Sequence, residues 1–293
     1  MKGIILAGGK GTRLYPVTLG TCKQLLPVYD KPLIYYPLAV LMQAGIREVL
    51  IITTPEDFHR FQALFKDGAH LGISISFATQ PEPKGIAEAF VLGADFIGQD
   101  TVCLILGDNI FYGHHLADVI RPCTELKEGR IVFGYEVNDP QRYGVISFDD
   151  DGGVKDIIEK PQDPPSPYAV TGLYFYDNNV IDIARHLKPS KRGEYEITDV
   201  NVAYLQSKKL RVRLLDRGFA WLDTGTHDAL QKASNYVQTI QERQGIKIAC
   251  LEEIAYQQGF ISFEQLEKLS AAASVSEYGH YLQKLCMKSA FSV

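Results

Sequence analysis

Three short segments in the first half of this chain are apolar without a polar interruption, and they limit the possible folds more than any other feature. A strand with no polar alternation must be covered on both faces of its sheet. The stretches between these segments have the pattern of helices. Buried strands that alternate with helices predict an α/β fold with a Rossmann-like, mixed and mainly parallel central sheet flanked by helices. The expected strands are 3–7, 48–53, 73–79 and 102–106, and the expected helices are 33–44, 56–65 and 85–97.

The second half has a different pattern, with strand candidates joined by short, turn-rich segments. These segments favour antiparallel additions to the same sheet over a separate domain. Residues 161–167 contain four prolines in seven positions, which predicts an extended loop. The additional strand candidates are 131–137, 144–148, 154–158 and 170–176.

From Thr226 to the end of the chain the pattern is mostly helical. Thr226 can cap a helix that runs to about Gln244, and Ser262 with Gln265 forms a capping-box pattern. We therefore divide the chain into an α/β core, residues 1–225, and a helical C-terminal region, residues 226–293.

The charge balance argues against a nucleic-acid partner. The chain has 30 basic and 35 acidic residues, a net charge of −5 and a pI near 5.8, whereas duplex binders usually present a basic face. The net charge does not exclude a small phosphorylated ligand, because an acidic protein can contain a local basic pocket. No apolar run approaches the roughly 18 residues of a membrane span, and no signal peptide is evident. Five widely spaced cysteines without a C-x-x-C pair favour a reducing cytoplasm.

The segment 6–16 follows the first buried strand and contains three glycines in four residues. Loops at the carboxyl ends of strands are where α/β sheets bind ligands, and such glycines let backbone N–H groups approach phosphate oxygens. Arg13 adds a forked donor. A dinucleotide fingerprint would need glycine where Leu14 stands, and no Walker loop occurs. Taken alone, the loop could equally be a tight turn with a solvated arginine. Lys23 could likewise be a surface lysine with no ligand contact.

Two aspartates are candidate ligands for a divalent metal ion. Asp108 follows the apolar strand 102–106, and Asp223 lies between an apolar segment and the expected cap at Thr226. Each could instead serve a turn or a cap. Beside a phosphate loop, however, two carboxylates suit Mg²⁺. The seven histidines show no metal-binding spacing.

Segment 6–16 has the pattern L-x-G-G-x-G-T-R-L-x-P, and residues 23–27 read K-Q-L-L-P. Together they resemble the signature of the sugar-1-phosphate nucleotidyltransferases, and the similarity covers nearly the whole chain. The longer stretches are most similar to members that use dTTP and glucose 1-phosphate. The other matching segments are 29–32, 106–109, 159–161, 170–176 and 221–226.

The resemblance implies Mg²⁺-dependent transfer of a thymidylyl group from dTTP to glucose 1-phosphate, which releases pyrophosphate and begins dTDP-sugar biosynthesis of the dTDP-rhamnose type. The expected path is a direct in-line displacement at the α-phosphorus. A sugar phosphate is already largely dianionic at neutral pH, because its second pKa is about 6, so no general base is needed. The protein must instead supply positioning and positive charge.

The resemblance also assigns site residues, with the nucleotide in the first half of the core and the sugar phosphate in the second. The catalytic set is Arg13, Lys23, Lys160, Asp108 and Asp223, of which the two aspartates match the metal ligands. The nucleotide set is Leu6, Gly8, Gly9, Gly11, Thr12, Arg13, Lys23, Gln24, Gln80, Gly85 and Asp108. The sugar-phosphate set is Asn109, Tyr143, Gly144, Glu159, Lys160, Val170 and Arg192. Arg192 could instead be an exposed loop charge.

Two positions depart from the family pattern. Lys84 stands where an acidic or polar residue is expected, and Tyr195 replaces a leucine. The alternatives are transfer from UTP or to another hexose 1-phosphate, because apolar pockets discriminate a methyl group by only about 1–3 kcal/mol, and a non-catalytic nucleotide-sugar sensor. The family is typically a homotetramer with feedback at a second site between subunits, which places some contacts beyond Thr226. Apolar residues there, such as Phe260 and Leu266, more often form intramolecular core.

Overall fold

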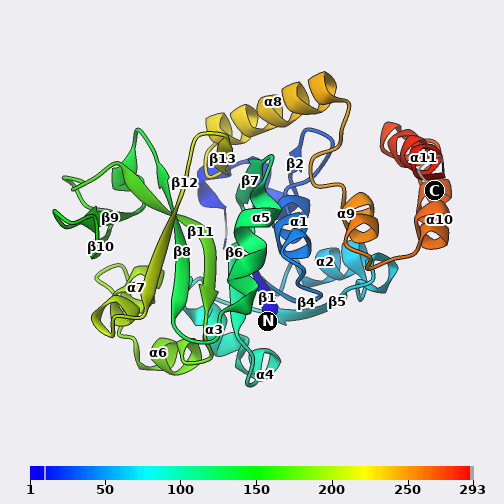
Figure 1. Cartoon of the computed structure of the whole chain (residues 1–293). Helices are drawn as coiled ribbons and strands as arrows, with labels where there is room; N and C mark the ends of the chain where they lie inside the picture. Colours follow the sequence, from blue (N-terminus) through cyan, green and yellow to red (C-terminus); the bar gives the residue numbers. More distant parts are fainter. Residues whose placement is uncertain (10, 291–293) are drawn as a thin grey trace.

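The computed structural model describes residues 1–9 and 11–290, and within them nine strands form one central sheet. The first-half strands are parallel to one another, and the expected mixed, mainly parallel α/β architecture is confirmed (Figure 1). These strands are β1 (Lys2–Ala7), β4 (Glu48–Thr53), β5 (Ser74–Thr79) and β6 (Val102–Leu106). Two opposite faces of β1 are buried, because Ile4 and Ile5 enter separate apolar clusters on the two sides of the sheet.

The second-half strands extend the same sheet. β11 pairs antiparallel with β6, β8 and β9, as expected, whereas β12 is parallel to β8, which the sequence pattern did not indicate. These strands are β8 (Arg130–Glu136), β9 (Gly144–Phe148), β10 (Val154–Glu159), β11 (Tyr168–Tyr176) and β12 (Leu210–Leu215). Two small ribbons lie off the sheet: β2 (Pro27–Val28) with β3 (Lys31–Pro32), and β7 (Asn109–Gly113) with β13 (Phe219–Asp223).

Helices cover both faces of the sheet. They are α1 (Tyr35–Gln43), α2 (Phe58–Phe65), α3 (Glu88–Leu92), α4 (Ala94–Ile97), α5 (Leu116–Ile120), α6 (Val180–His186) and α7 (Ile197–Gln206). The expected helix 85–97 is divided into α3 and α4 at Gly93, where a Cβ atom would lie 2.9 Å from the Ile4 side chain. The chain there approaches the sheet too closely for a side chain. Short 3₁₀ turns occur at Thr12–Leu14, Val17–Leu19, Lys23–Leu25, Ala69–Leu71, Arg121–Glu125 and Pro140–Arg142.

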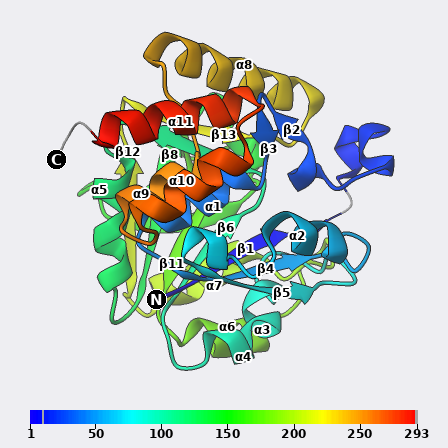
Figure 2. The same cartoon turned by 90° about the vertical axis from the view of Figure 1, so that its right-hand side faces the viewer.

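The C-terminal region is helical, as expected, with α8 (His227–Gln244), α9 (Leu251–Gln257), α10 (Phe263–Ala272) and α11 (Glu277–Ala290); residues 291–293 lie outside the described part. The hydroxyls of Thr226 and Ser262 accept hydrogen bonds from Ala229 and Gln265 N–H groups, so both predicted caps are confirmed. Leu266 is fully buried. α9 packs on α1, and α10 and α11 pack on α9 (Figure 2).

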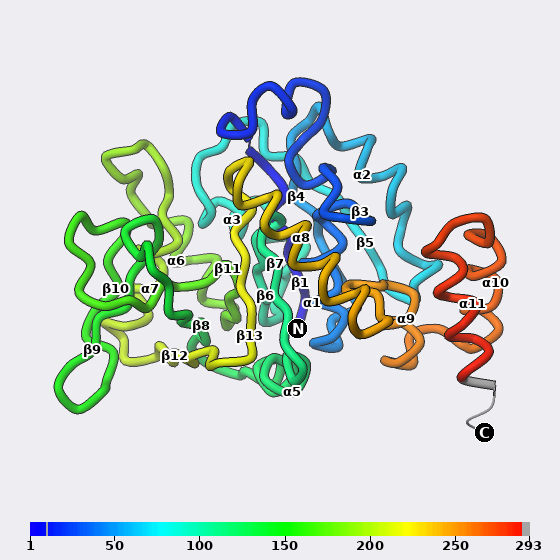
Figure 3. The backbone as a smooth tube through the Cα atoms, turned by 90° about the horizontal axis from the view of Figure 1, so that it is seen from above, coloured from blue at the N-terminus to red at the C-terminus, as the bar shows by residue number. Residues whose placement is uncertain are grey.

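The last two helices lie far from the second-half strands of the sheet. α10 and α11 lie at one end of the molecule, and β9 and β10 at the other (Figure 3). All five cysteines are free thiols. Among the described residues, no helix combines the length and apolarity needed to cross a membrane.

Candidate active site

A cavity of about 760 Å³ lies at the carboxyl ends of β1 and β6, and strands from both halves of the core contribute to its wall. This volume is in the range of small-molecule sites. Most of the residues expected at the site line this cavity. They are Leu6, Gly8, Gly9, Arg13, Gln80, Gly85, Asp108, Asn109, Tyr143, Gly144, Glu159, Lys160, Val170, Arg192 and Asp223.

Four expected residues do not line the cavity: Gly11, Thr12, Lys23 and Gln24. Lys23 is buried behind the wall, where its Nζ atom lies 2.6 Å from Oδ2 of Asp108. Gln24 is also buried, and its Nε2 donates to the carbonyl oxygen of Gly8 at 3.5 Å. Lys23 and Gln24 therefore contact the cavity wall from behind.

Asp108 stands directly beside the glycine loop because β6 and β1 are parallel neighbours. The Gly107 N–H continues their ladder by donating to the carbonyl of Leu6 at 2.9 Å. The Asp108 carboxylate binds Lys23 through one oxygen and the Asn109 amide, at 2.9 Å, through the other. Burial would raise the pKa of Asp108, but the Lys23 charge and these hydrogen bonds outweigh burial and lower the pKa below its ordinary value. Asp108 is therefore anionic at neutral pH.

Asp223 reaches the same place through the β7–β13 ribbon, in which it pairs directly opposite Asn109. The next residue, Thr224, donates its hydroxyl to the Asp108 carbonyl at 2.8 Å. The two carboxylates are thus joined by backbone contacts although they are 115 positions apart in sequence. The guanidinium of Arg142, which the sequence analysis did not single out, lies 2.7 Å from Oδ2 of Asp223.

Asn109 connects the ribbon with the main sheet. Its Oδ1 accepts from the Trp221 indole N–H at 2.6 Å and from the Gly172 N–H at 3.2 Å. A Cβ atom on Gly172 would lie 2.4 Å from that oxygen, so glycine is required there. The Asn109 side chain, expected to contact the sugar, is therefore largely engaged in holding Asp108, β11 and β13 together.

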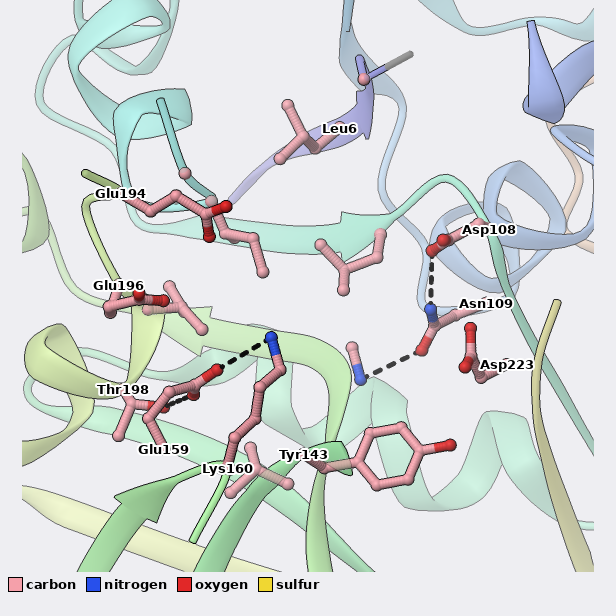
Figure 4. Close-up of a pocket in the computed structure, with 18 of the residues that line it drawn as sticks. Leu6, Asp108, Asn109, Tyr143, Glu159, Lys160, Glu194, Glu196, Thr198 and Asp223 are labelled. Carbon is pink, nitrogen blue, oxygen red and sulfur yellow. Dashed lines mark hydrogen bonds and ion pairs between the residues drawn. The ribbon is translucent and has the colours of Figure 1, made fainter. Parts of the chain in front are cut away.

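The opposite side of the cavity carries a network of acidic and basic side chains (Figure 4). Glu159 accepts a hydrogen bond of 2.5 Å from the Thr198 hydroxyl and lies 3.4 Å from both Lys160 and Arg192. Arg192 also binds Glu196 at 2.8 Å. The carboxylates therefore hold two of the expected phosphate-binding cations beside the cavity.

Lys160 has an unusual backbone conformation. Its φ is +44°, in the left-handed region that non-glycine residues seldom adopt. Its N–H donates to the Tyr143 carbonyl at 2.9 Å, which holds the turn after β10. Burial and the Asp223 charge raise the pKa of Tyr143 to about 12, so its hydroxyl stays protonated. The backbone hydrogen bond thus holds the neutral Tyr143 hydroxyl and the cationic Lys160 ammonium on the same part of the cavity wall.

The charges on the wall nearly cancel. The lining contains four cationic side chains and five anionic ones. The cations are Arg13, Arg142, Lys160 and Arg192, and the anions are Asp108, Glu159, Glu194, Glu196 and Asp223. Because two polyanionic reactants would add only negative charge, this wall suits a further cation. Mg²⁺ commonly takes one or two carboxylates plus phosphate oxygens, and Asp108 and Asp223 fit that requirement. No group of three or more metal-ligating side chains occurs among the described residues.

Comparison with known proteins identifies the family. A sequence model described as nucleotidyl transferase matches residues 2–240. The chain belongs to the nucleotidyl transferase family. This nucleotidyltransferase is 57% identical over 289 residues to a glucose-1-phosphate thymidylyltransferase of Xanthomonas campestris, with 99% of this chain and 98% of the relative covered. It is 56% identical over 288 residues to one of Neisseria meningitidis, with 98% and 100% covered.

Solved structures agree with this fold. A Bacillus anthracis protein, assigned as a glucose-1-phosphate thymidylyltransferase and crystallised with sucrose, has a TM-score of 0.75 and 42% identity, and the match covers 80% of this chain and 94% of that one. A UDP-glucose pyrophosphorylase bound to UDP-glucose has a TM-score of 0.68 and 30% identity, and the match covers 81% and 98%.

Several residues of the nucleotidyltransferase site escaped the sequence analysis. Arg142 could have been noticed as a cation directly before Tyr143, but its pairing with Asp223 depends on a strand 81 positions away. Thr198 and Glu196 could have been noticed because they follow Arg192 closely in sequence. The other lining residues not expected at the site are Pro83, Ile86, Leu106, Gly172, Tyr174, Glu194, Ile197, Asn201 and Trp221.

Proposed function

We propose that this nucleotidyltransferase transfers a thymidylyl group from dTTP to α-D-glucose 1-phosphate, giving dTDP-glucose and pyrophosphate. The main support is the meeting of the glycine loop, the two aspartates and the sugar-side cations around one cavity. The names of relatives that share more than half of this chain's residues support the choice of substrates. The reaction would begin dTDP-sugar biosynthesis of the dTDP-rhamnose type.

The chain's own residues supply positioning and charge. Arg13, next to the loop that follows β1, is exposed and makes no ion pair with any other described residue, which leaves it available for the triphosphate. Lys160 and Arg192 can exchange their carboxylate partners for the phosphate of the sugar. An attacking phosphate oxygen needs no base, and Tyr143 remains a neutral donor. Direct in-line displacement, with inversion at the α-phosphorus, follows as the expected path.

Mg²⁺ is proposed as the metal, with Asp108 and Asp223 as its protein ligands. When bound, it supplies positive charge to phosphate oxygens and helps to orient them. Lys23 and Arg142 bind the two aspartates in the structure. We therefore expect Lys23 to keep Asp108 ionised and Arg142 to orient the Asp223 carboxylate.

Uridylyl transfer is the second candidate, because a UDP-glucose pyrophosphorylase shares this fold at 30% identity. Thymine and uracil differ by one methyl group, which contributes only about 1–3 kcal/mol of discrimination in an apolar pocket. The relatives at 57% identity favour dTTP.

The deciding experiment measures pyrophosphate release from the purified enzyme with Mg²⁺ and glucose 1-phosphate. dTTP, UTP, dATP and GTP are offered singly and in competition, and chromatography identifies the sugar nucleotide. We expect dTDP-glucose as the main product. Release with none of the four would reject the proposed function, and a covalent nucleotidyl-enzyme formed with dTTP alone would reject direct displacement.

We further propose that the enzyme is a homotetramer with feedback at a second site between subunits, partly through the helices beyond Thr226. Val275 is 97% exposed and Met287 65% exposed in this region, which supports contacts there. Sedimentation at micromolar concentration tests the proposal, and a purely monomeric enzyme would overturn it.

A further inference from the structure

The amide of Gln80 can have only one orientation in this structure. Its Nε2 lies 2.7 Å from Oε2 of Glu88 and 3.5 Å from the carbonyl oxygen of Gly85. A carboxylate and a carbonyl are both acceptors, so the atom that faces them must be the NH₂ group. Gln80 is 4% exposed, which leaves its side chain little freedom to turn.

The other end of this amide is therefore a hydrogen-bond acceptor at the cavity. Oε1 lies beside Gly8, where an added Cβ atom would be only 2.7 Å away. Gly8, Gln80 and Gly85 all line the cavity. No described residue donates a hydrogen bond to this oxygen, so it is available to a ligand.

A backbone donor lies near this acceptor. The Gly85 N–H makes no hydrogen bond within residues 1–9 and 11–290. Gly85 has φ +110°, and a Cβ atom there would lie 2.4 Å from the Tyr195 carbonyl oxygen. Tyr195 also donates its N–H to the Lys84 carbonyl at 2.7 Å and accepts from the Ala87 N–H at 3.2 Å. These backbone contacts hold the donor in place.

We propose that Glu88 is a specificity-determining residue that holds Gln80 as an acceptor, so that the site selects bases with an adjacent N–H donor and carbonyl acceptor. This proposal rests on the proposed function and specifies how its base is recognised. Thymine and uracil present N3–H beside a carbonyl, which matches Gln80 Oε1 and the Gly85 N–H. Cytosine presents an unprotonated N3 beside an amino group, which reverses both roles. Glu88 acts through Gln80 and is a positioning residue.

A Glu88→Gln substitution preserves shape but removes the closer of the two constraints on the Gln80 amide, leaving only the 3.5 Å contact with the Gly85 carbonyl. A glutamine at position 88 can donate or accept, so the Gln80 amide can turn and present its NH₂ group to cytosine. We expect the wild-type enzyme to prefer dTTP over dCTP by at least about a hundredfold, because sites built around hydrogen bonds reject mismatched partners strongly. In Glu88→Gln the preference should fall by about tenfold or more. The preference between dTTP and UTP should not change, since both bases carry the same edge.

The preference is measured in two ways: by kcat/KM with glucose 1-phosphate, and by calorimetric binding of dTTP and dCTP without it. Glu82→Gln is the matched control, because it removes an equal charge from the same loop, where the one ion pair of Glu82 with a described residue is that with the exposed Lys84 at 3.3 Å. Equal wild-type binding of dTTP and dCTP would overturn the proposal. The proposal would also fail if folded Glu88→Gln kept the wild-type preference for dTTP over dCTP, or if Glu82→Gln lost as much of that preference as Glu88→Gln.

Gln80→Leu provides a second test if Glu88→Gln fails to fold. Without the acceptor only the Gly85 N–H still discriminates, so the preference for dTTP over dCTP should fall at least as far as in Glu88→Gln, and an unchanged preference would overturn the proposal. The binding measurement also separates two failures. A wild-type enzyme that binds dTTP selectively but releases no pyrophosphate would contradict the proposed function and leave the role of Glu88 supported.

Discussion

Nη2 of Arg142 lies 2.7 Å from Oδ2 of Asp223, while Nη1 of the same side chain lies 2.7 Å from Asp139. One guanidinium thus bridges an expected metal ligand and the residue that precedes the 3₁₀ turn Pro140–Arg142, in which Arg142 itself lies. A positive charge so close to a carboxylate opposes the approach of a divalent cation.

Removal of this arginine should therefore strengthen metal binding. In Arg142→Gln we expect Mn²⁺, a spin-active substitute for Mg²⁺, to bind about fivefold more tightly without nucleotide, because a part-exposed ion pair contributes up to about 1 kcal/mol. Electron paramagnetic resonance titration measures the free ion. Arg185→Gln is the control, since Arg185 pairs with Asp182 on the surface. Unchanged Mn²⁺ affinity in Arg142→Gln would show that Arg142 does not compete with the metal.

Asp223→Asn should lower turnover without unfolding the protein. We expect kcat to fall by roughly 10²–10³-fold, the usual cost of removing a group that stabilises transition-state charge. Circular dichroism should be unchanged, because β7–β13 pairing uses the backbone. The control is Asp216→Asn, in the exposed segment just before β13. Wild-type turnover in Asp223→Asn would remove Asp223 from the proposed metal site.

Acid should weaken the attachment of the β2–β3 ribbon to the C-terminal region. Asp30 pairs with Lys31 and Lys247. Burial would raise the pKa of Asp30, but these lysines and Gln241 outweigh it and lower the pKa below its ordinary value of 3.8. Its stabilising contribution is therefore fully present above about pH 4 and is lost as the pH falls through the lower folded value.

Urea unfolding between pH 7 and pH 2.5 tests this contribution. We expect Asp30→Asn to lose about 3 kcal/mol at pH 7, because a buried lysine loses its partner, and to approach the wild type at the acid end. The partly exposed pair of Asp100 and Lys2 provides the comparison, and Asp100→Asn should cost less than about 1 kcal/mol. Parallel pH curves for the wild type and Asp30→Asn would contradict the assignment.

Arg130 is a fully buried cation, and it forms no ion pair with a described carboxylate. Its guanidinium donates to Asn201 Oδ1 and lies 5.0 Å from the Tyr176 ring centre, and burial lowers the pKa of Arg130 to about 10. The Tyr176 hydroxyl donates to the same Asn201 oxygen at 2.8 Å, so that oxygen keeps a partner without Arg130.

Arg130→Met should therefore keep or raise the free energy of unfolding, because an apolar side chain of similar length avoids the cost of burying a charge. Arg130→Ala should lower it by about 3 kcal/mol, since a cavity remains. Denaturant titrations measure both variants. If Arg130→Met lost as much stability as Arg130→Ala, the buried charge would be net stabilising.

The buried strands were predictable because their signal is local. Residues 49–52 and 102–106 are apolar throughout, and they lie in β4 (Glu48–Thr53) and β6 (Val102–Leu106). β7 and β13 escaped prediction because each is short and mixed in composition, and each is completed only by pairing about 110 positions away. The parallel addition of β12 to β8 was missed for the same reason: Leu210–Leu215 alternates apolar and basic residues, which does not indicate its partner.

The same distinction holds for the candidate site. The glycine loop and Asp108 follow apolar strands, so topology alone predicts their shared edge. Arg142 and Glu88 depend on side-chain partners that only the folded chain brings near, Asp223 and Gln80. Lys23 was expected at the nucleotide but lies behind the wall on Asp108, a placement that its sequence context, next to Gln24 and two leucines, does not indicate.

The β7–β13 ladder sets the spacing of Asp108 and Asp223, whereas the Gln80 amide, which we propose faces the base, belongs to a separate segment beyond β5. The proposed metal ligands and the amide proposed to read the base thus lie on different elements of the fold. An engineer who exchanged the segment 80–88 for one with a different donor and acceptor order would need to keep its contacts with Gly8 and Tyr195, and could then pursue unnatural sugar nucleotides without altering β7 or β13.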